Sequence, residues 1–191
     1  MIELPHGVEL VLASTSPRRA ELLGGLDLLF DVRLPDIDET PLPGEAPAPY
    51  VERLARAKAA AVVAADTVVL AADTTVDLDG TILGKPSTSS EAADMLAALS
   101  GRDHLVHTGV AVATRLGVET VTVSTSVRFA ALTTSDIEWY IDTGEPFDKA
   151  GGYGIQGRAA SFVASIDGSV TNVIGLPLAE TVALLRSTAA R

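Results

Sequence analysis

The start of the chain combines a short apolar segment, a turn rich in hydroxyl groups and a helix, and this order constrains the fold more than any other feature. Residues Glu9–Ala13 read ELVLA, which predicts a short buried strand. Ser16 and Pro17 then favour a helix start, because serine can cap a helix and the missing N–H of proline costs nothing there. Gly24 and Gly25 predict the end of that helix. A strand that leads directly into a helix indicates an α/β fold.

The rest of the chain alternates the two kinds of element. Helices are expected at 51–63, 90–99, 135–140 and 178–185, and strands at 68–76, 107–114, 119–129 and 162–166. A hairpin turn at 77–80, an acidic proline-rich loop at 36–49 and a glycine-rich loop at 144–157 connect them. We therefore expect residues 1–191 to form one α/β domain, with a mixed, twisted sheet flanked by helices.

Composition excludes several classes of protein. Hydrophobic residues make up 47% of the chain, which is enough for a core, and the lack of cysteine excludes disulfides, thiolate metal sites and a cysteine nucleophile. The net charge of −11 argues against binding of long nucleic acid, whereas a small polyanion can still bind where a few cations gather. The N-terminus does not resemble a signal peptide, and the apolar stretch 59–72 is too short to span a membrane. We expect a cytoplasmic protein.

The first candidate site is the sequence STSPRR at 14–19. Free N–H groups and the dipole at a helix start favour an anion, and Ser14 lies in the turn before the helix. Arg18 and Arg19 add planar donors that suit phosphate oxygens. The alternative is an ordinary helix start with two solvated arginines.

Four carboxylates form the second candidate site. Asp36, Asp38 and Glu39 lie close together in the sequence, and Asp73 follows much later. Mg²⁺ and Mn²⁺ prefer such hard oxygen ligands, commonly one or two of them together with substrate phosphates. A solvated acidic loop is the alternative.

Two glycine-containing loops also suggest ligand binding. Residues 80–86, GTILGKP, are not a Walker A loop, because the glycines are too close together and Pro86 replaces the hydroxyl residue; Lys85 remains a candidate phosphate contact. Residues 148–157 combine many glycines with Gln156, whose amide can both donate to and accept from a base edge. A flexible surface loop is the alternative for this segment.

The histidines and serines offer no further catalytic signature. His6, His104 and His107 lack the spacing of metal ligands, so we expect structural roles for them. No G-x-S-x-G motif is present, which argues against a serine hydrolase.

Together these segments resemble the Maf family of nucleotide pyrophosphatases over nearly the whole chain. The resemblance is carried by LASTSPRR at 12–19, ELL at 21–23, DE at 38–39, LARAKA at 54–59, ADT at 72–74, LGKP at 83–86, LSG at 99–101, HTG at 107–109, DKAG at 148–151, YGIQG at 153–157 and NVIGLP at 172–177. It implies an ITPase-like fold with two lobes around a nucleotide-binding cleft, and assembly as a homodimer.

The tripeptide Ala-Asp-Thr occurs twice, so the position of the catalytic aspartate must be chosen. In the Maf family this aspartate precedes the glycine of the Gly-Lys-Pro segment by eleven residues, which is the separation of Asp73 from Gly84. Asp66 lies eighteen residues before Gly84 and is expected at the end of the preceding helix or in the turn after it.

The resemblance implies hydrolysis of a nucleoside triphosphate to the monophosphate and pyrophosphate with Mg²⁺ or Mn²⁺. It assigns Asp73 as the general base and, with Glu39, as a metal ligand. The triphosphate contacts would come from Ser14, Arg18, Arg19, Lys58 and Lys85, with Lys149 as a weaker candidate. It also implies removal of non-standard nucleotides and a role in cell-division arrest. The alternatives are a non-catalytic nucleotide-binding regulator of septum formation and a phosphatase that releases orthophosphate.

The branch of the family is indicated by three residues. Arg18, Thr74 and Gln156 match the type that prefers dTTP and UTP, and not the type that acts on 7-methyl-GTP. Gln156 could accept from the imide N–H of uracil and donate to one carbonyl, while Thr74 donates to the other. Thr75 departs slightly from the family pattern, in which an aliphatic residue is commoner.

Overall fold

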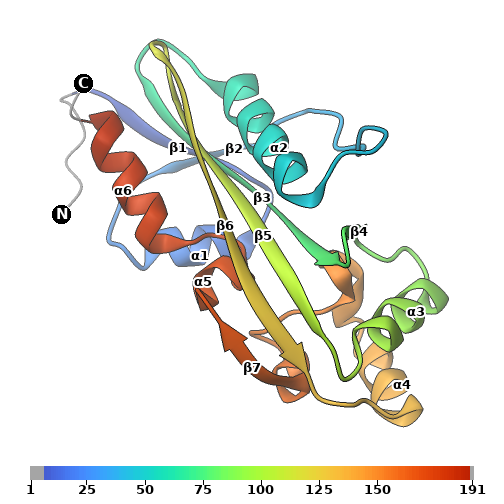
Figure 1. Ribbon diagram of the computed structural model, residues 1–191. Helices are drawn as coiled ribbons and strands as arrows, with labels where there is room; N and C mark the ends of the chain where they lie inside the picture. The colour runs from blue at the N-terminus through green and yellow to red at the C-terminus, as the bar shows by residue number, and fades with distance from the viewer. Residues whose placement is uncertain (1–6, 190–191) are drawn as a thin grey trace.

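One mixed sheet of seven strands organises the protein, whose computed structural model describes residues 7–189 (Figure 1). The strands are β1 (Glu9–Ala13), β2 (Asp31–Arg33), β3 (Thr67–Leu78), β4 (Thr81–Leu83), β5 (Asp103–Thr114), β6 (Gly117–Phe129) and β7 (Val163–Asp167). Their order is β2-β1-β3-β5-β6-β7, and β4 pairs with β3. β1 runs parallel to β2 and β3, and every other pair is antiparallel. The α/β class predicted from the sequence is confirmed.

Six α-helices accompany the sheet: α1 (Pro17–Gly24), α2 (Pro47–Val62), α3 (Ser89–Leu99), α4 (Thr134–Asp142), α5 (Val170–Ile174) and α6 (Leu178–Ala189). α2 begins four residues earlier than expected, because proline is tolerated in a first helical turn. The expected loop at 144–157 contains two short 3₁₀ helices, Glu145–Asp148 and Ala150–Gly152, and a third, Arg158–Phe162, follows it. Within residues 7–189, no helix is both long and apolar enough to cross a membrane. His6 lies outside the described residues.

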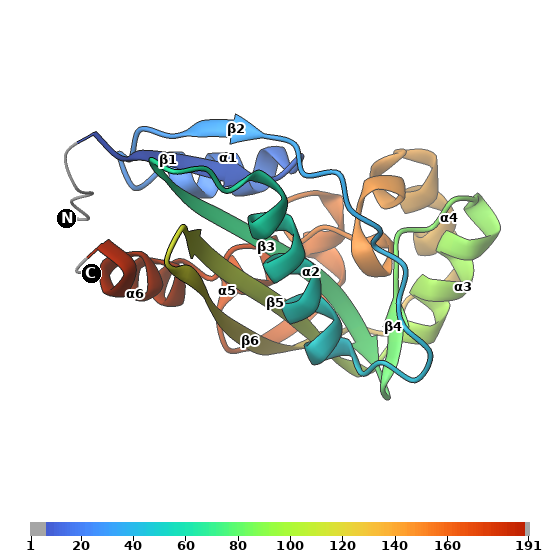
Figure 2. The same ribbon diagram turned by 90° about the horizontal axis from the view of Figure 1, so that it is seen from above.

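Side chains that alternate along β3 form separate cores on the two faces of the sheet. Val68, Leu70 and Ala72 pack with residues of β1, β5, α1 and α6, whereas Val69 and Ala71 pack with alanines of α2. A third core lies at the other end of the long strands, among α3, α4 and the 3₁₀ helices. Figures 1 and 2 both show α3 and α4 at this end and α6 at the opposite end. The cores thus divide the protein into two parts that share the long strands.

The edge of β3 is uncovered where the two parts meet. β1 pairs with Thr67–Ala71 and stops, because the chain turns into α1. β4 pairs with the same strand only from Val76 to Leu78. Residues 72–75 therefore lack a neighbouring strand on this side. A crevice beyond the carboxyl end of a strand is a common ligand site in α/β proteins.

Candidate functional site

A cavity of about 400 Å³ opens at this gap, within the size range of small-molecule sites. It is lined by the turn before α1, by α2, by the uncovered part of β3, by the segments around 84–85 and 148–157, and by the end of α5 at 173–174. Ten of the candidate site residues predicted from the sequence line it: Ser14, Arg18, Arg19, Glu39, Lys58, Asp73, Thr74, Lys85, Lys149 and Gln156. Asp36 and Asp38 do not, and Asp38 instead accepts a hydrogen bond from the Thr40 N–H.

An ion cluster lies at the base of this cleft. The Lys58 Nζ donates to Asp73 Oδ1 at 2.6 Å and forms an ion pair with Glu39 Oε1 at 2.7 Å. Burial alone would raise the pKa of Glu39, but the hydrogen bond from Lys58 and the nearby cations outweigh it and lower the pKa. Both carboxylates therefore lie against one ammonium group, close to each other.

Lys58 reaches Asp73 because α2 packs very closely on the sheet. Asp73 in β3 is paired with Gly109 in β5, and a Cβ on Gly109 would lie 2.4 Å from the Val51 carbonyl oxygen of α2. Only a glycine permits this approach. Lys58 follows Val51 by two helical turns, and helical side chains lean toward the N-terminus of their helix, which directs Lys58 over the sheet.

The turn before α1 holds Arg19 in a fixed orientation. Arg19 Nε donates to the Gly175 carbonyl at 2.8 Å, and its two terminal nitrogens donate to Ser14 Oγ at 3.2 Å and Thr74 Oγ1 at 3.0 Å. Burial lowers the pKa of Arg19, and the nearby Asp73 opposes that shift. Three of the five guanidinium hydrogens are used in these bonds, so two remain for a ligand. Ser16, in contrast, makes no side-chain cap to α1; its N–H donates to Ser14 Oγ.

The hydroxyl of Thr74 is less available than the sequence suggested. Thr108 Oγ1 donates its hydrogen to the Asn172 carbonyl at 3.0 Å, so it can only accept in its 2.9 Å contact with Thr74 Oγ1. Thr74 therefore donates to Thr108 while accepting from Arg19. In this arrangement the Thr74 hydrogen cannot also donate to a base carbonyl, and the residue positions Arg19 instead.

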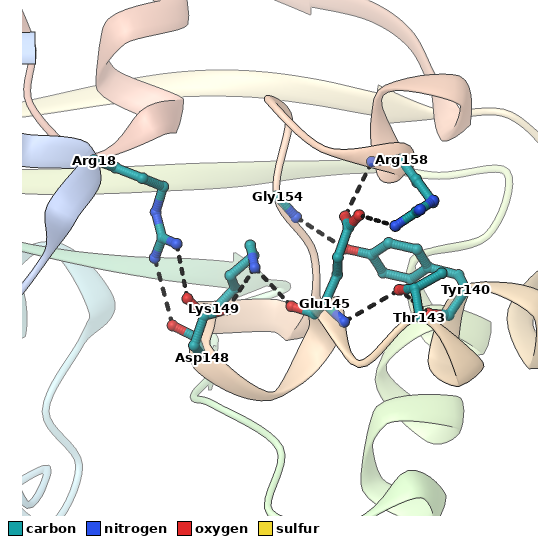
Figure 3. A network of polar contacts seen from close by, with 8 residues as sticks. All are labelled: Arg18, Tyr140, Thr143, Glu145, Asp148, Lys149, Gly154 and Arg158. Atoms are coloured by element: carbon teal, nitrogen blue, oxygen red, sulfur yellow. Dashed lines mark hydrogen bonds and ion pairs between the residues drawn. The ribbon is translucent and has the colours of Figure 1, made fainter. Parts of the chain in front are cut away.

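A second polar network joins the two parts of the protein across the cleft (Figure 3). Arg18 of α1 bonds the Asp148 carboxylate at 2.8 Å, and Lys149 bonds the other oxygen of that carboxylate. Burial would raise the pKa of Asp148, but the hydrogen bonds from Lys149 and Arg18 lower it. Lys149 also donates to the Glu145 carbonyl, and Glu145 accepts from the N–H of Arg158. The network fixes the loop that carries Gln156.

The remaining predicted residues lie at the rim. Gln156 and Lys85 are exposed, and both side chains can reach a ligand without breaking a described contact. Tyr50 was missed by the sequence analysis, although it lines the cleft and its hydroxyl donates to the Glu39 carbonyl at 3.0 Å. Burial and the nearby Asp73 and Glu39 raise the pKa of Tyr50 to about 12, so it stays a neutral donor. Its place at a loop–helix boundary gave no signal for this contact.

The charges of the cleft differ from those of the whole protein. The lining holds Arg18, Arg19, Lys58, Lys85 and Lys149 against Glu39, Asp73 and Asp148, an excess of two positive charges in a chain of net charge −11.

Among residues 7–189, no three His, Cys, Asp or Glu side chains converge as a metal site. Two carboxylates nevertheless suit Mg²⁺ when phosphate oxygens complete its coordination. Fold and site together define an α/β protein that binds a phosphorylated small molecule.

Comparison with known proteins narrows this class. Residues 9–188 match the family model described as Maf-like protein, so the chain belongs to this family. The dTTP/UTP pyrophosphatase of Anaeromyxobacter dehalogenans strain 2CP-C is 59% identical over 181 residues, which cover 93% of this chain and 92% of the relative. The dTTP/UTP pyrophosphatase of Myxococcus xanthus strain DK1622 is 56% identical over 178 residues, covering 92% and 90%. Among solved structures, a HAM1 protein from Coxiella burnetii aligns with a TM-score of 0.41 and 21% identity over 65% of this chain and 74% of its own.

Proposed function

We propose that this protein hydrolyses nucleoside triphosphates, foremost dTTP and UTP, to the nucleoside monophosphate and pyrophosphate. The observation that carries the proposal is the convergence of five cations and the Asp73–Glu39 pair in one cleft. The names of the relatives supply the substrate class.

The cations are suited to hold the triphosphate. Arg19 is oriented by three hydrogen bonds and keeps two N–H groups for phosphate oxygens. Arg18, Lys85 and Lys149 add charge around the same cavity. In phosphoryl transfer the protein contributes mainly placement and neutralisation of charge, and these residues supply both.

Asp73 is the proposed general base. Its Oδ1 accepts from Lys58, and no described residue bonds to Oδ2, which can accept a proton from water. The water would attack the α-phosphorus in line with the leaving pyrophosphate. Lys58, Arg19 and the other cations would stabilise the charge that develops on the phosphate oxygens.

Glu39 and Asp73 are the proposed ligands of Mg²⁺ or Mn²⁺. The two residues fit this role, because both are hard carboxylates and both lie against the ammonium group of Lys58, which brings them close to one point. When bound, the metal would supply additional positive charge to the triphosphate.

Gln156 is the proposed base-reading residue. Its amide is exposed at the cleft rim and can pair with both the imide N–H and a carbonyl of uracil or thymine. Cytosine has a different donor pattern and would leave one of these groups unpaired, at a cost of about 1–3 kcal/mol. Thr74 would contribute through Arg19, as its hydrogen is used by Thr108. The homodimer, the cytoplasmic location and the cell-division role stay predictions.

The test is product identification with α-labelled dTTP, with Mg²⁺ or Mn²⁺ and with chelator. We expect pyrophosphate release that stops in chelator, and the highest kcat/KM for dTTP and UTP in a panel that includes CTP, GTP, ATP and 7-methyl-GTP. Orthophosphate as the product would indicate a phosphatase. Nucleotide binding with no product would indicate a binding regulator. A panel led by 7-methyl-GTP would contradict the proposed specificity.

A further inference from the structure

Lys58 lies between the same two carboxylates that are the proposed metal ligands. Its Nζ is 2.6 Å from Asp73 Oδ1 and 2.7 Å from Glu39 Oε1, and its side chain is only 8% exposed. An ammonium group buried to this extent needs paired anions. In the protein without ligand, Lys58 therefore already compensates one of the two negative charges that the carboxylates present.

A divalent cation at these carboxylates would lie next to the ammonium of Lys58. Like charges at such a short separation repel strongly, and the low exposure of Lys58 and Asp73 limits screening by solvent. A triphosphate changes this balance, because its oxygens provide new acceptors for Lys58 and additional ligands for the metal.

We propose that Lys58 acts as an internal substitute for the metal, so that the protein binds a divalent cation tightly only together with a triphosphate. The inference rests on the proposed function for the identity of the metal ligands. It adds an order of binding: the metal enters with the nucleotide, and Lys58 moves its hydrogen bonds from the carboxylates to phosphate.

Mn²⁺ alone is the probe that tests this inference. Nucleotide-free wild type, Lys58→Met, Lys58→Arg and Lys85→Met are each titrated with Mn²⁺. Electron paramagnetic resonance measures the Mn²⁺ that stays free, which gives the affinity of each protein. Met has a similar length and no charge, Arg keeps the charge, and Lys85→Met removes one cation of the same cleft that forms no ion pair with either carboxylate in the described structure. We expect Lys58→Met to bind Mn²⁺ at least about tenfold more tightly than wild type. The other two variants should stay within about threefold of wild type.

Thermal unfolding provides a second readout. Removing Lys58 leaves the buried carboxylate of Asp73 without its ion-pair partner, so in chelator Lys58→Met should melt at least about 5 °C below wild type. Mn²⁺ should restore most of this loss, because it replaces the missing charge, whereas it should change the melting temperature of wild type little. A general packing defect would not respond to Mn²⁺.

Equal Mn²⁺ affinities of wild type and Lys58→Met would overturn the inference. So would a Lys58→Met protein that is unfolded in chelator and stays unfolded in Mn²⁺, or a Lys58→Arg variant that gains affinity as strongly as Lys58→Met. These outcomes are independent of catalysis. If wild type releases pyrophosphate but Lys58→Met gains no affinity for Mn²⁺, the proposed function stands and only the role of Lys58 is refuted.

Discussion

The close contact between α2 and the sheet predicts a large effect of Gly109→Ala. The new Cβ would lie 2.4 Å from the Val51 oxygen, 2.6 Å from the Val51 carbon and 2.8 Å from the Glu52 nitrogen, all of them backbone atoms. Ordinary contacts begin at 3.4 Å, so α2 must retreat by about 1 Å. Overpacking of this kind costs about 1–3 kcal/mol.

The displacement should also affect activity, because α2 carries Lys58 to Asp73. A misplacement of about 1 Å can reduce turnover by about 10²-fold, so we expect kcat/KM to fall by about 10- to 100-fold. Urea unfolding and pyrophosphate release measure the two effects. Gly24→Ala is the control: it lies at the end of α1 with no atom near its Cβ, and should be neutral or slightly stabilising. Equal stability of Gly109→Ala and wild type would refute the packing argument.

Three further predictions concern single residues. Asp73→Asn should reduce pyrophosphate release by at least about 10²-fold, whereas Asp66→Asn, in an exposed turn, should be close to wild type in the same assay. Burial lowers the pKa of His104 to about 4. The stability that the neutral ring contributes above the unfolded-state pKa of about 6.5 should therefore be lost as the pH falls from there to about 4. In urea unfolding, the free energy of unfolding of His104→Gln should depend less on pH, by roughly 3 kcal/mol over this range. Gln156→Leu should lower kcat/KM for UTP by about 10-fold and reduce its advantage over CTP.

The long elements were predictable from local pattern, and the short ones were not. β3, β5 and β6 are continuous apolar or alternating runs. β2 and β4 have three residues each, too few for a periodic signal, and they form only because a neighbouring strand offers an edge. α5 has five residues and depends on tertiary contacts in the same way. Local sequence thus predicted the long elements, which contain enough residues for a recognisable pattern, and not the short ones.

The members of the site were predictable, and their contacts were not. Charge and the family pattern selected Asp73, Glu39 and the cations, but nothing local indicated that Lys58 joins the two carboxylates. The pairing of Arg18 with Asp148 joins residues 130 positions apart. The direction of the Thr74 hydrogen bond depends on Thr108, which is itself constrained by a carbonyl in α5. Such dependence between side chains exists only in the folded protein.

The gap beside β3 also has a consequence for biosynthesis. The parallel pairing of β1 with β3 closes a long loop that contains α1, β2 and α2, and such nonlocal pairing is slow to form. The last segment to line the cleft, at 173–174, follows every strand of the sheet. A nascent chain can therefore form α1 and α2 early on the ribosome, but it completes the lining of the cleft only after residues 173–174 have been synthesised.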